Sequence, residues 1–176
     1  MSNHIHQLNA SYNAAEDRIL LRLNTTNKDE FRIWLTRRVM RRLAEMLGSA
    51  ERRLLGLENP EHGLVTPGAR AIQDFRREAS TAGVNFGERF VEETAGFPFG
   101  EAPVLATGCE VHPQDENAVV SLQLANKSTL TFLLDVRGIH GTLAMLQKAV
   151  AHSEWNLMVQ ELEGSPLPVA ERSGLH

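Results

Sequence analysis

The chain has 176 residues, of which 42% are hydrophobic and 23% charged, and its formal net charge is −4 at neutral pH. This is the composition of a soluble globular domain, and no uncharged apolar run reaches the roughly 18 residues of a membrane-spanning helix. The single cysteine, Cys109, excludes an internal disulfide framework. The N-terminus lacks the basic and apolar regions of a signal peptide, which predicts a cytoplasmic protein.

The first third of the chain is predicted to contain three strands. Residues 4–12 alternate weakly between apolar and polar side chains, and residues 18–25 and 29–35 alternate clearly on either side of a short polar loop. Successive side chains of a strand point to opposite faces, so one face of this hairpin is apolar. That face carries Ile19, Leu21, Leu23, Phe31, Ile33 and Leu35. The opposite face carries Arg18, Leu20, Arg22, Glu30, Arg32 and Trp34.

A helix is predicted to follow directly. Thr36 is placed to cap it, Arg37 to begin it and Gly56 to end it. At about 100° per residue, the aliphatic side chains fall within one arc and the arginines on the other side. We therefore expect the aliphatic stripe to pack on the sheet and the arginines to face outward.

The middle of the chain is predicted to link two halves. Thr66 and Pro67 are typical of the cap and first turn of a helix, which we expect to reach about Ala82. A strand is expected over residues 88–94 and a loop over residues 96–100.

The second half is predicted to repeat the strands and the helix. Strand patterns cover residues 103–112, 118–125 and 128–134, and a helix capped by Asp135 continues to about His152. A closing strand is expected over residues 154–162, before a flexible tail.

Two segments of the chain follow the same order of strand, turn, strand, cap and helix. Residues 18–47 align with residues 118–146, so that Leu35-Thr36 matches Leu134-Asp135 and residues 43–47 match residues 143–146 when one-residue shifts are allowed. Duplication and shared apolar patterning are both explanations of this likeness. The predicted class is α+β, with antiparallel sheets covered by helices and two related strand–strand–helix units in one compact domain. The boundaries are a first unit at 1–60, a linking region at 61–100, a second unit at 101–162 and a tail at 163–176.

Charge is unevenly spread along the chain. Residues 1–60 carry ten Lys and Arg against seven Asp and Glu, whereas the remaining residues carry eight against fifteen. A basic half beside an acidic half indicates an anionic partner for one face, or self-association between unlike faces. The alternative is a solvated helix surface, on which arginine is common.

Candidate metal ligands occur in two places. His4 and His6 share one side of a predicted strand, and Cys109 and His112 have a C-x-x-H spacing. Exposed terminal histidines and a cysteine buried in the core explain the same residues, and the paired-cysteine signatures of zinc sites are absent. The sequence therefore predicts neither a metal nor a cofactor.

Catalytic motifs are also absent. The chain has no G-x-S-x-G elbow, phosphate-binding loop or dinucleotide fingerprint, so no catalytic residue is assigned. Backbone amides at Gly138 and Gly141, beside Arg137, form a candidate anion site, which would suit an enzyme with a small anionic substrate. The alternative is that these glycines allow a helix to pack closely on the sheet.

The polar face of the first hairpin is a candidate nucleic-acid site. Arg18, Arg22 and Arg32 would contact phosphates and Trp34, with Tyr12 beside it, would stack on bases. A curled sheet backed by a helix and present twice resembles the layout of the Whirly and Pur-type single-strand binders, although none of their sequence motifs is found. The alternative is that Trp34 is buried between the two repeats or across a dimer.

One further resemblance covers about the first quarter of the chain. Residues 17–25 (DRILLRLNT) and 30–38 (EFRIWLTRR) resemble the N-terminus of uncharacterised proteobacterial proteins, which implies a bacterial cytoplasmic protein and no defined activity.

The leading functional prediction is a non-enzymatic binding or assembly module that acts through protein–protein contacts, as a homo-oligomer and away from membranes. Its expected contact surfaces are the arginine-rich helix and the apolar sheet face. Single-stranded nucleic-acid binding is the alternative, and an enzyme with an anion site at residues 137–141 is the third hypothesis.

Overall fold

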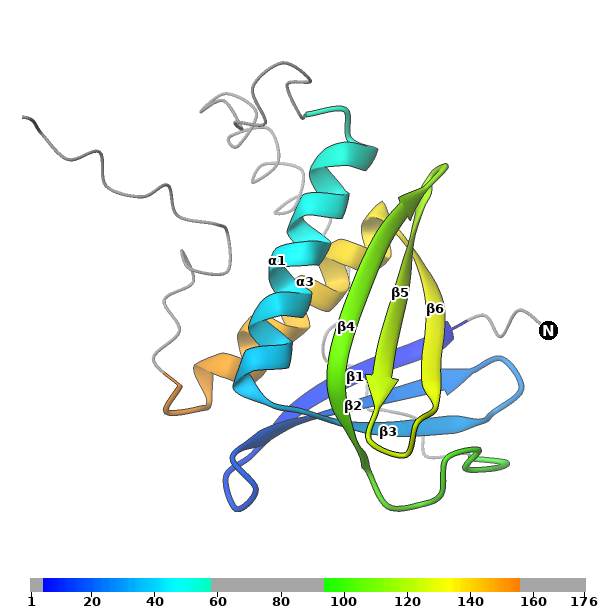
Figure 1. Ribbon diagram of the computed structural model, residues 1–176, viewed down its shortest axis with the longest axis vertical. Coiled ribbons are helices and arrows are strands. Elements are labelled where there is room, and N and C mark those ends of the chain that lie inside the picture. Colours follow the sequence, from blue (N-terminus) through cyan, green and yellow to red (C-terminus); the bar gives the residue numbers. More distant parts are fainter. Residues whose placement is uncertain (1–4, 58–93, 156–176) are drawn as a thin grey trace, which may run out of the picture.

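A computed structural model describes residues 5–57 and 94–155, which form six strands and two helices (Figure 1). The elements are β1 (Ile5–Asn13), β2 (Arg18–Thr25), β3 (Glu30–Leu35), α1 (Arg37–Leu54), β4 (Val104–Gln114), β5 (Asn117–Leu124), β6 (Thr129–Asp135) and α3 (Val136–Ala151). The α+β class and the two strand–strand–helix units are confirmed. The predicted helix at 66–82, and most or all of the predicted strands at 88–94 and 154–162 and the tail, lie outside the described residues. Neither described helix combines the length and the apolar character needed to span a bilayer.

The six strands form one sheet in the order β1-β2-β3-β4-β5-β6. All neighbours are antiparallel except β3 and β4, which run parallel and pair only through Ile33 with Val104 and Trp34 with Leu105. This short seam joins two three-stranded halves that are steeply inclined to each other (Figure 1). Within the described residues, β1 and β6 are the two edges of the sheet.

The two units repeat at a spacing of 99 residues. Lys28 and Lys127 both have positive φ, 64° and 67°, in the turns before the third strand of each unit. Each of these lysines donates its backbone N–H to the last residue of the preceding strand, Thr25 or Leu124. The caps, Thr36 and Asp135, keep the same spacing. This register matches Leu47 with Leu146 and Leu43 with Thr142, within the one-residue shift that the predicted alignment allows.

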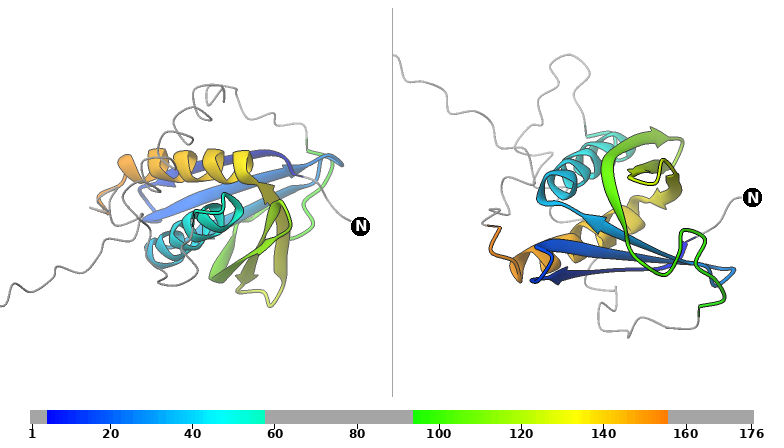
Figure 2. Two further views of the ribbon diagram at one scale, coloured as in Figure 1. Left: turned by 90° about the horizontal axis from the view of Figure 1, so that it is seen from above. Right: turned by 60° about the horizontal axis from the view of Figure 1, so that its bottom comes forward.

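Each helix packs mainly on the other unit. Among the strands, α1 contacts chiefly β4 and α3 contacts chiefly β1, and the two helices also contact each other (Figure 2). Each helix therefore covers mainly strands of the other unit rather than strands of its own. A single residue, Thr36, connects β3 to α1. Because β3 lies beside β4, a helix that turns back so abruptly is placed over β4.

The predicted apolar face of the first hairpin forms part of the core. Ile19, Leu21, Ile33 and Leu35 are almost fully buried. Tyr12 also lies on this face, because it is paired directly with Ile19 across β1 and β2. The prediction that placed it beside the outward arginines is therefore wrong.

The helix cap at Thr36 gives a direct test of this local structure. Its Oγ1 accepts the backbone N–H of Val39 at 3.3 Å. We expect Thr36→Ala to lower the free energy of unfolding by about 1 kcal/mol, because one amide of the first turn loses its acceptor. Thr36→Ser keeps the hydroxyl and should retain most of the stability. Urea denaturation measures both, and equal losses in the two variants would contradict the assignment.

Candidate binding site

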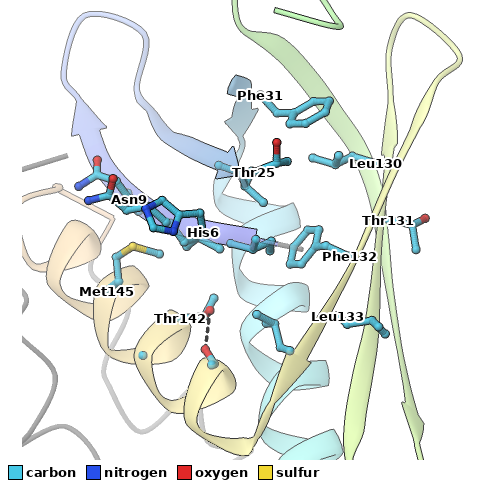
Figure 3. Close-up of a pocket in the computed structure, with 18 of the residues that line it drawn as sticks. His6, Asn9, Thr25, Phe31, Leu130, Thr131, Phe132, Leu133, Thr142 and Met145 are labelled. Carbon is cyan, nitrogen blue, oxygen red and sulfur yellow. Dashed lines mark hydrogen bonds between the residues drawn. The ribbon is translucent and has the colours of Figure 1, made fainter. Parts of the chain in front are cut away.

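A groove of about 1690 Å³ lies between the two edge strands and α3 (Figure 3). Residues 5–12 of β1 and residues 129–135 of β6 all line it, together with one side of α3. Phe31, Leu130, Phe132 and Met145 provide apolar surface at its walls. Alternate side chains of a strand point to opposite faces, so one face alone would contribute only every second residue. Because consecutive residues of both strands line the groove, the edges of these strands border it.

The groove occupies the position of a second seam between the units. On one side of the molecule, β3, the third strand of the first unit, pairs with β4, the first strand of the second. The equivalent strands on the other side, β6 and β1, do not pair within the described residues. We call this gap the open seam.

Trp34 and Leu133 show the difference between the two seams. They occupy equivalent positions, 99 residues apart, in β3 and β6. Trp34 is half-buried and has Leu105 of β4 as its cross-strand neighbour. Leu133 is 45% exposed, and no other large hydrophobic side chain among the described residues is classed as exposed. A strand paired with β6 in the open seam would give Leu133 a cross-strand neighbour, as β4 gives Trp34 one.

Both edge strands carry little of the usual protection against pairing with another chain, since Asp135 at the end of β6 is the single Asp, Glu, Lys or Arg in them. Residues 5–13 contain no Asp, Glu, Lys, Arg or Pro, and neither do residues 129–134. Natural edge strands are commonly protected by charged side chains, proline or bulges. One bulge interrupts the pairing of β1 with β2 between Ile5 and Gln7, and the rest of this edge is regular.

The side of α3 that faces the groove is open in its centre and basic at both ends. An added Cβ at Gly141 would meet no atom within 4 Å. Arg137 and Lys148 are exposed and form no ion pair with the described residues. They lie three helical turns apart, about 16 Å along the axis, with Gly141 and Met145 between them.

At the predicted anion site at the start of α3, the carboxylate of Asp135 already occupies the position of the anion. Asp135 accepts the backbone N–H of Gly138 at 2.7 Å. A second anion at this amide would be repelled by that carboxylate. The alternative explanation, close helix–sheet packing, is wrong for Gly141, which has open space beside it.

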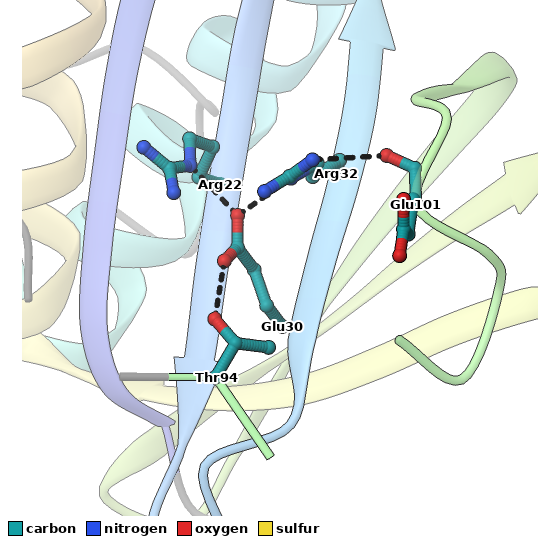
Figure 4. Close-up of polar contacts among 5 residues, drawn as sticks. All are labelled: Arg22, Glu30, Arg32, Thr94 and Glu101. Atoms are coloured by element: carbon teal, nitrogen blue, oxygen red, sulfur yellow. Dashed lines mark hydrogen bonds and ion pairs between the residues drawn. The ribbon is translucent and has the colours of Figure 1, made fainter. Parts of the chain in front are cut away.

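The predicted nucleic-acid residues lie on one face of the sheet, as expected, but two of them share an acid (Figure 4). Nε of Arg22 and Nε of Arg32 both donate to Oε1 of Glu30 at 2.8 Å, and Thr94 donates to Oε2 at 2.7 Å. Burial raises the pKa of the Glu30 carboxyl, but these hydrogen bonds lower it by more, so the pKa falls from 4.5 to about 2.

This network reduces the positive charge available on the predicted nucleic-acid face. Arg32 also donates to the backbone oxygen of Glu101 at 3.1 Å and lies 4.6 Å from the ring centre of Phe97. Arg18 lies 3.7 Å from Glu16, and Trp34 is half-buried. The arginines of this face already form ion pairs with glutamates, and its one tryptophan is partly covered. Nucleic-acid binding by this face stays a prediction.

The candidate metal ligands are not brought together. Cys109 is buried, and its Sγ lies 3.8 Å from the backbone oxygen of Val39, whereas the His112 side chain is exposed. Burial raises the pKa of the Cys109 thiol. His4 lies outside the described residues, which contain no group of three or more potential ligands placed to hold a metal.

A buried contact between two polar side chains of the helices was not predicted. The carboxylate of Glu51 on α1 contacts Nε2 of His140 on α3, and these residues are 0% and 1% exposed. No local signal marks the pair, because the two residues are far apart in sequence and meet only when α1 and α3 pack together.

Comparison with known proteins finds no matching family model, no matching curated protein and no matching solved structure.

Proposed function

We propose that this chain is a non-enzymatic binding module that takes a polypeptide segment of another protein in the open seam. The observation that carries the proposal is that two strand edges, β1 and β6, border one largely apolar groove and contain a single charged residue, Asp135 at the end of β6. At about 1690 Å³, the groove is larger than the roughly 300–1,000 Å³ of typical small-molecule sites. Strand backbone, apolar side chains and threonines are suited to holding a peptide.

Polypeptide is favoured over nucleic acid because of the surfaces involved. Base stacking requires exposed rings close to cations that are available to phosphates. The outer face instead holds a half-buried Trp34 and two arginines engaged with Glu30. A second copy of the chain is the competing occupant, and it would pair edge to edge through β1.

Selection from a random peptide display library tests the proposed function. Gly141→Phe places a ring on the side of α3 that lines the groove. The new Cβ would meet no atom within 4 Å, and replacing glycine within a helix does not lower helix propensity. We expect peptides selected on the full chain to bind Gly141→Phe at least tenfold more weakly.

The matched control is Ala151→Phe, which adds the same ring at an exposed position of α3 that does not line the groove. Its peptide affinity should equal that of the unmodified chain. Failure to select any peptide, or equal binding to both phenylalanine variants, would contradict the proposal. A stable dimer in ultracentrifugation whose β1 contact excludes peptides would also contradict it.

A further inference from the structure

We infer that the partner enters the open seam as an extended β-strand, apolar at alternate positions and with an acidic residue at each end. This inference rests on the proposed function and specifies its ligand. It joins three observations: two strand edges that border one groove, an apolar wall beside them, and two cations at opposite ends of α3.

The strand conformation follows from the backbone of the seam. Consecutive residues of β1 and of β6 line the groove, and none of the described strands pairs with the N–H and C=O groups along these two edges. Such groups need partners when they are covered, and an added strand supplies them along its whole length. At the other junction between the units, which we call the closed seam, β3 and β4 are already paired. Strand pairing between the two units is therefore part of this fold.

The alternation of side chains follows from the walls of the groove. Phe31, Leu130 and Phe132 lie on the inner side, where they would contact every second side chain of an added strand. On the other side, β6 presents Thr129 and Thr131 beside the exposed Leu133. The inner positions of the ligand should therefore be apolar, and most of its outer positions polar.

The acidic ends follow from the charges along α3. Arg137 and Lys148 lie about 16 Å apart, a distance that an extended strand covers in about five residues. Two carboxylates also line the groove, at Asp135 and Asp29. The first already accepts the Gly138 amide, and the second follows the β2–β3 turn rather than α3. Arg137 and Lys148 therefore make the α3 side attractive to acids.

A synthetic seven-residue peptide tests the inference. The probe has glutamate at both ends of alternating valine and threonine, and its affinity for the full chain is measured by calorimetry. We expect at least tenfold weaker binding when both glutamates are replaced by lysine, and when the amides along one edge of the peptide are N-methylated. The charge reversal Arg137→Glu/Lys148→Glu should weaken binding of the acidic probe and restore that of the lysine probe.

The charge exchange separates this inference from the proposed function. If library peptides bind in a manner that depends on Gly141, but the probe does not bind or responds to neither the charge exchange nor N-methylation, the strand inference is wrong while the proposed function stands. If no peptide binding depends on Gly141, the proposed function itself fails.

Discussion

Replacing His140 with leucine is expected to lower the free energy of unfolding by about 1–3 kcal/mol, because the buried Glu51 carboxylate loses its polar contact with the His140 ring. Glu51 and His140 have almost no exposed surface and join α1 to α3. The loss would be a large part of the 5–15 kcal/mol that typically stabilises a domain. Urea denaturation at neutral pH measures the effect.

The double variant Glu51→Leu/His140→Leu shows whether the lost stability comes from the contact between these two side chains or from loss of packing. Replacing both residues by apolar ones should be less destabilising than the sum of the two single replacements, since neither polar group then loses the other as its partner. His112→Leu is the control, because this histidine is exposed on β4 and its loss should change stability by less than about 0.5 kcal/mol. Additive losses in the double variant would contradict the pairing.

The second large effect is expected at Glu30, on the outer face of the sheet. Its carboxyl has a pKa of about 2 in the folded chain against an ordinary value of 4.5. A group whose pKa is lowered by folding adds stability above its unfolded pKa and loses that contribution as the pH falls toward its folded pKa. Glu30 should therefore contribute roughly 3 kcal/mol near neutral pH, which is lost between pH 4.5 and pH 2.

Glu30→Gln removes this contribution and its pH dependence together. We expect the variant to be less stable than the unmodified chain at pH 7, and the difference to shrink as the pH falls below 4.5. Glu101→Gln is the matched control, since Glu101 is exposed and takes part in the network only through its backbone oxygen. A difference in stability that stays constant from pH 7 to pH 2 would contradict the low pKa.

Local structure was predictable because the signals for it are local. Alternation over residues 18–25 and 29–35 identified β2 and β3 to within one residue, and Thr36 and Asp135 were correctly identified as helix caps. The pattern also separated the faces of the first hairpin correctly. Each of these features depends on neighbours within a few residues in the chain.

The arrangement of the units was not predictable in the same way. An apolar stripe shows which side of α1 is buried, but not that its partner strand is β4. Glu30 lies on the predicted outer face, yet one of the hydrogen bonds to its carboxylate comes from Thr94, 64 residues away. The groove likewise exists because β6 and β1 do not pair with each other. No local sequence pattern predicts whether two distant strands pair. The near absence of charge along both edge strands was visible in the sequence and was the available clue.

Amide hydrogen exchange of the full chain, with and without the glutamate-ended probe, tests the open seam most directly. Exchange reports the pairing of backbone N–H groups, which is what an added strand would change. The probe should slow exchange along β1 or β6 and leave the amides of β3 and β4 at the closed seam unchanged. Slowed exchange confined to α1 or to the outer face around Arg22 and Trp34, or no change at either edge strand, would contradict the account.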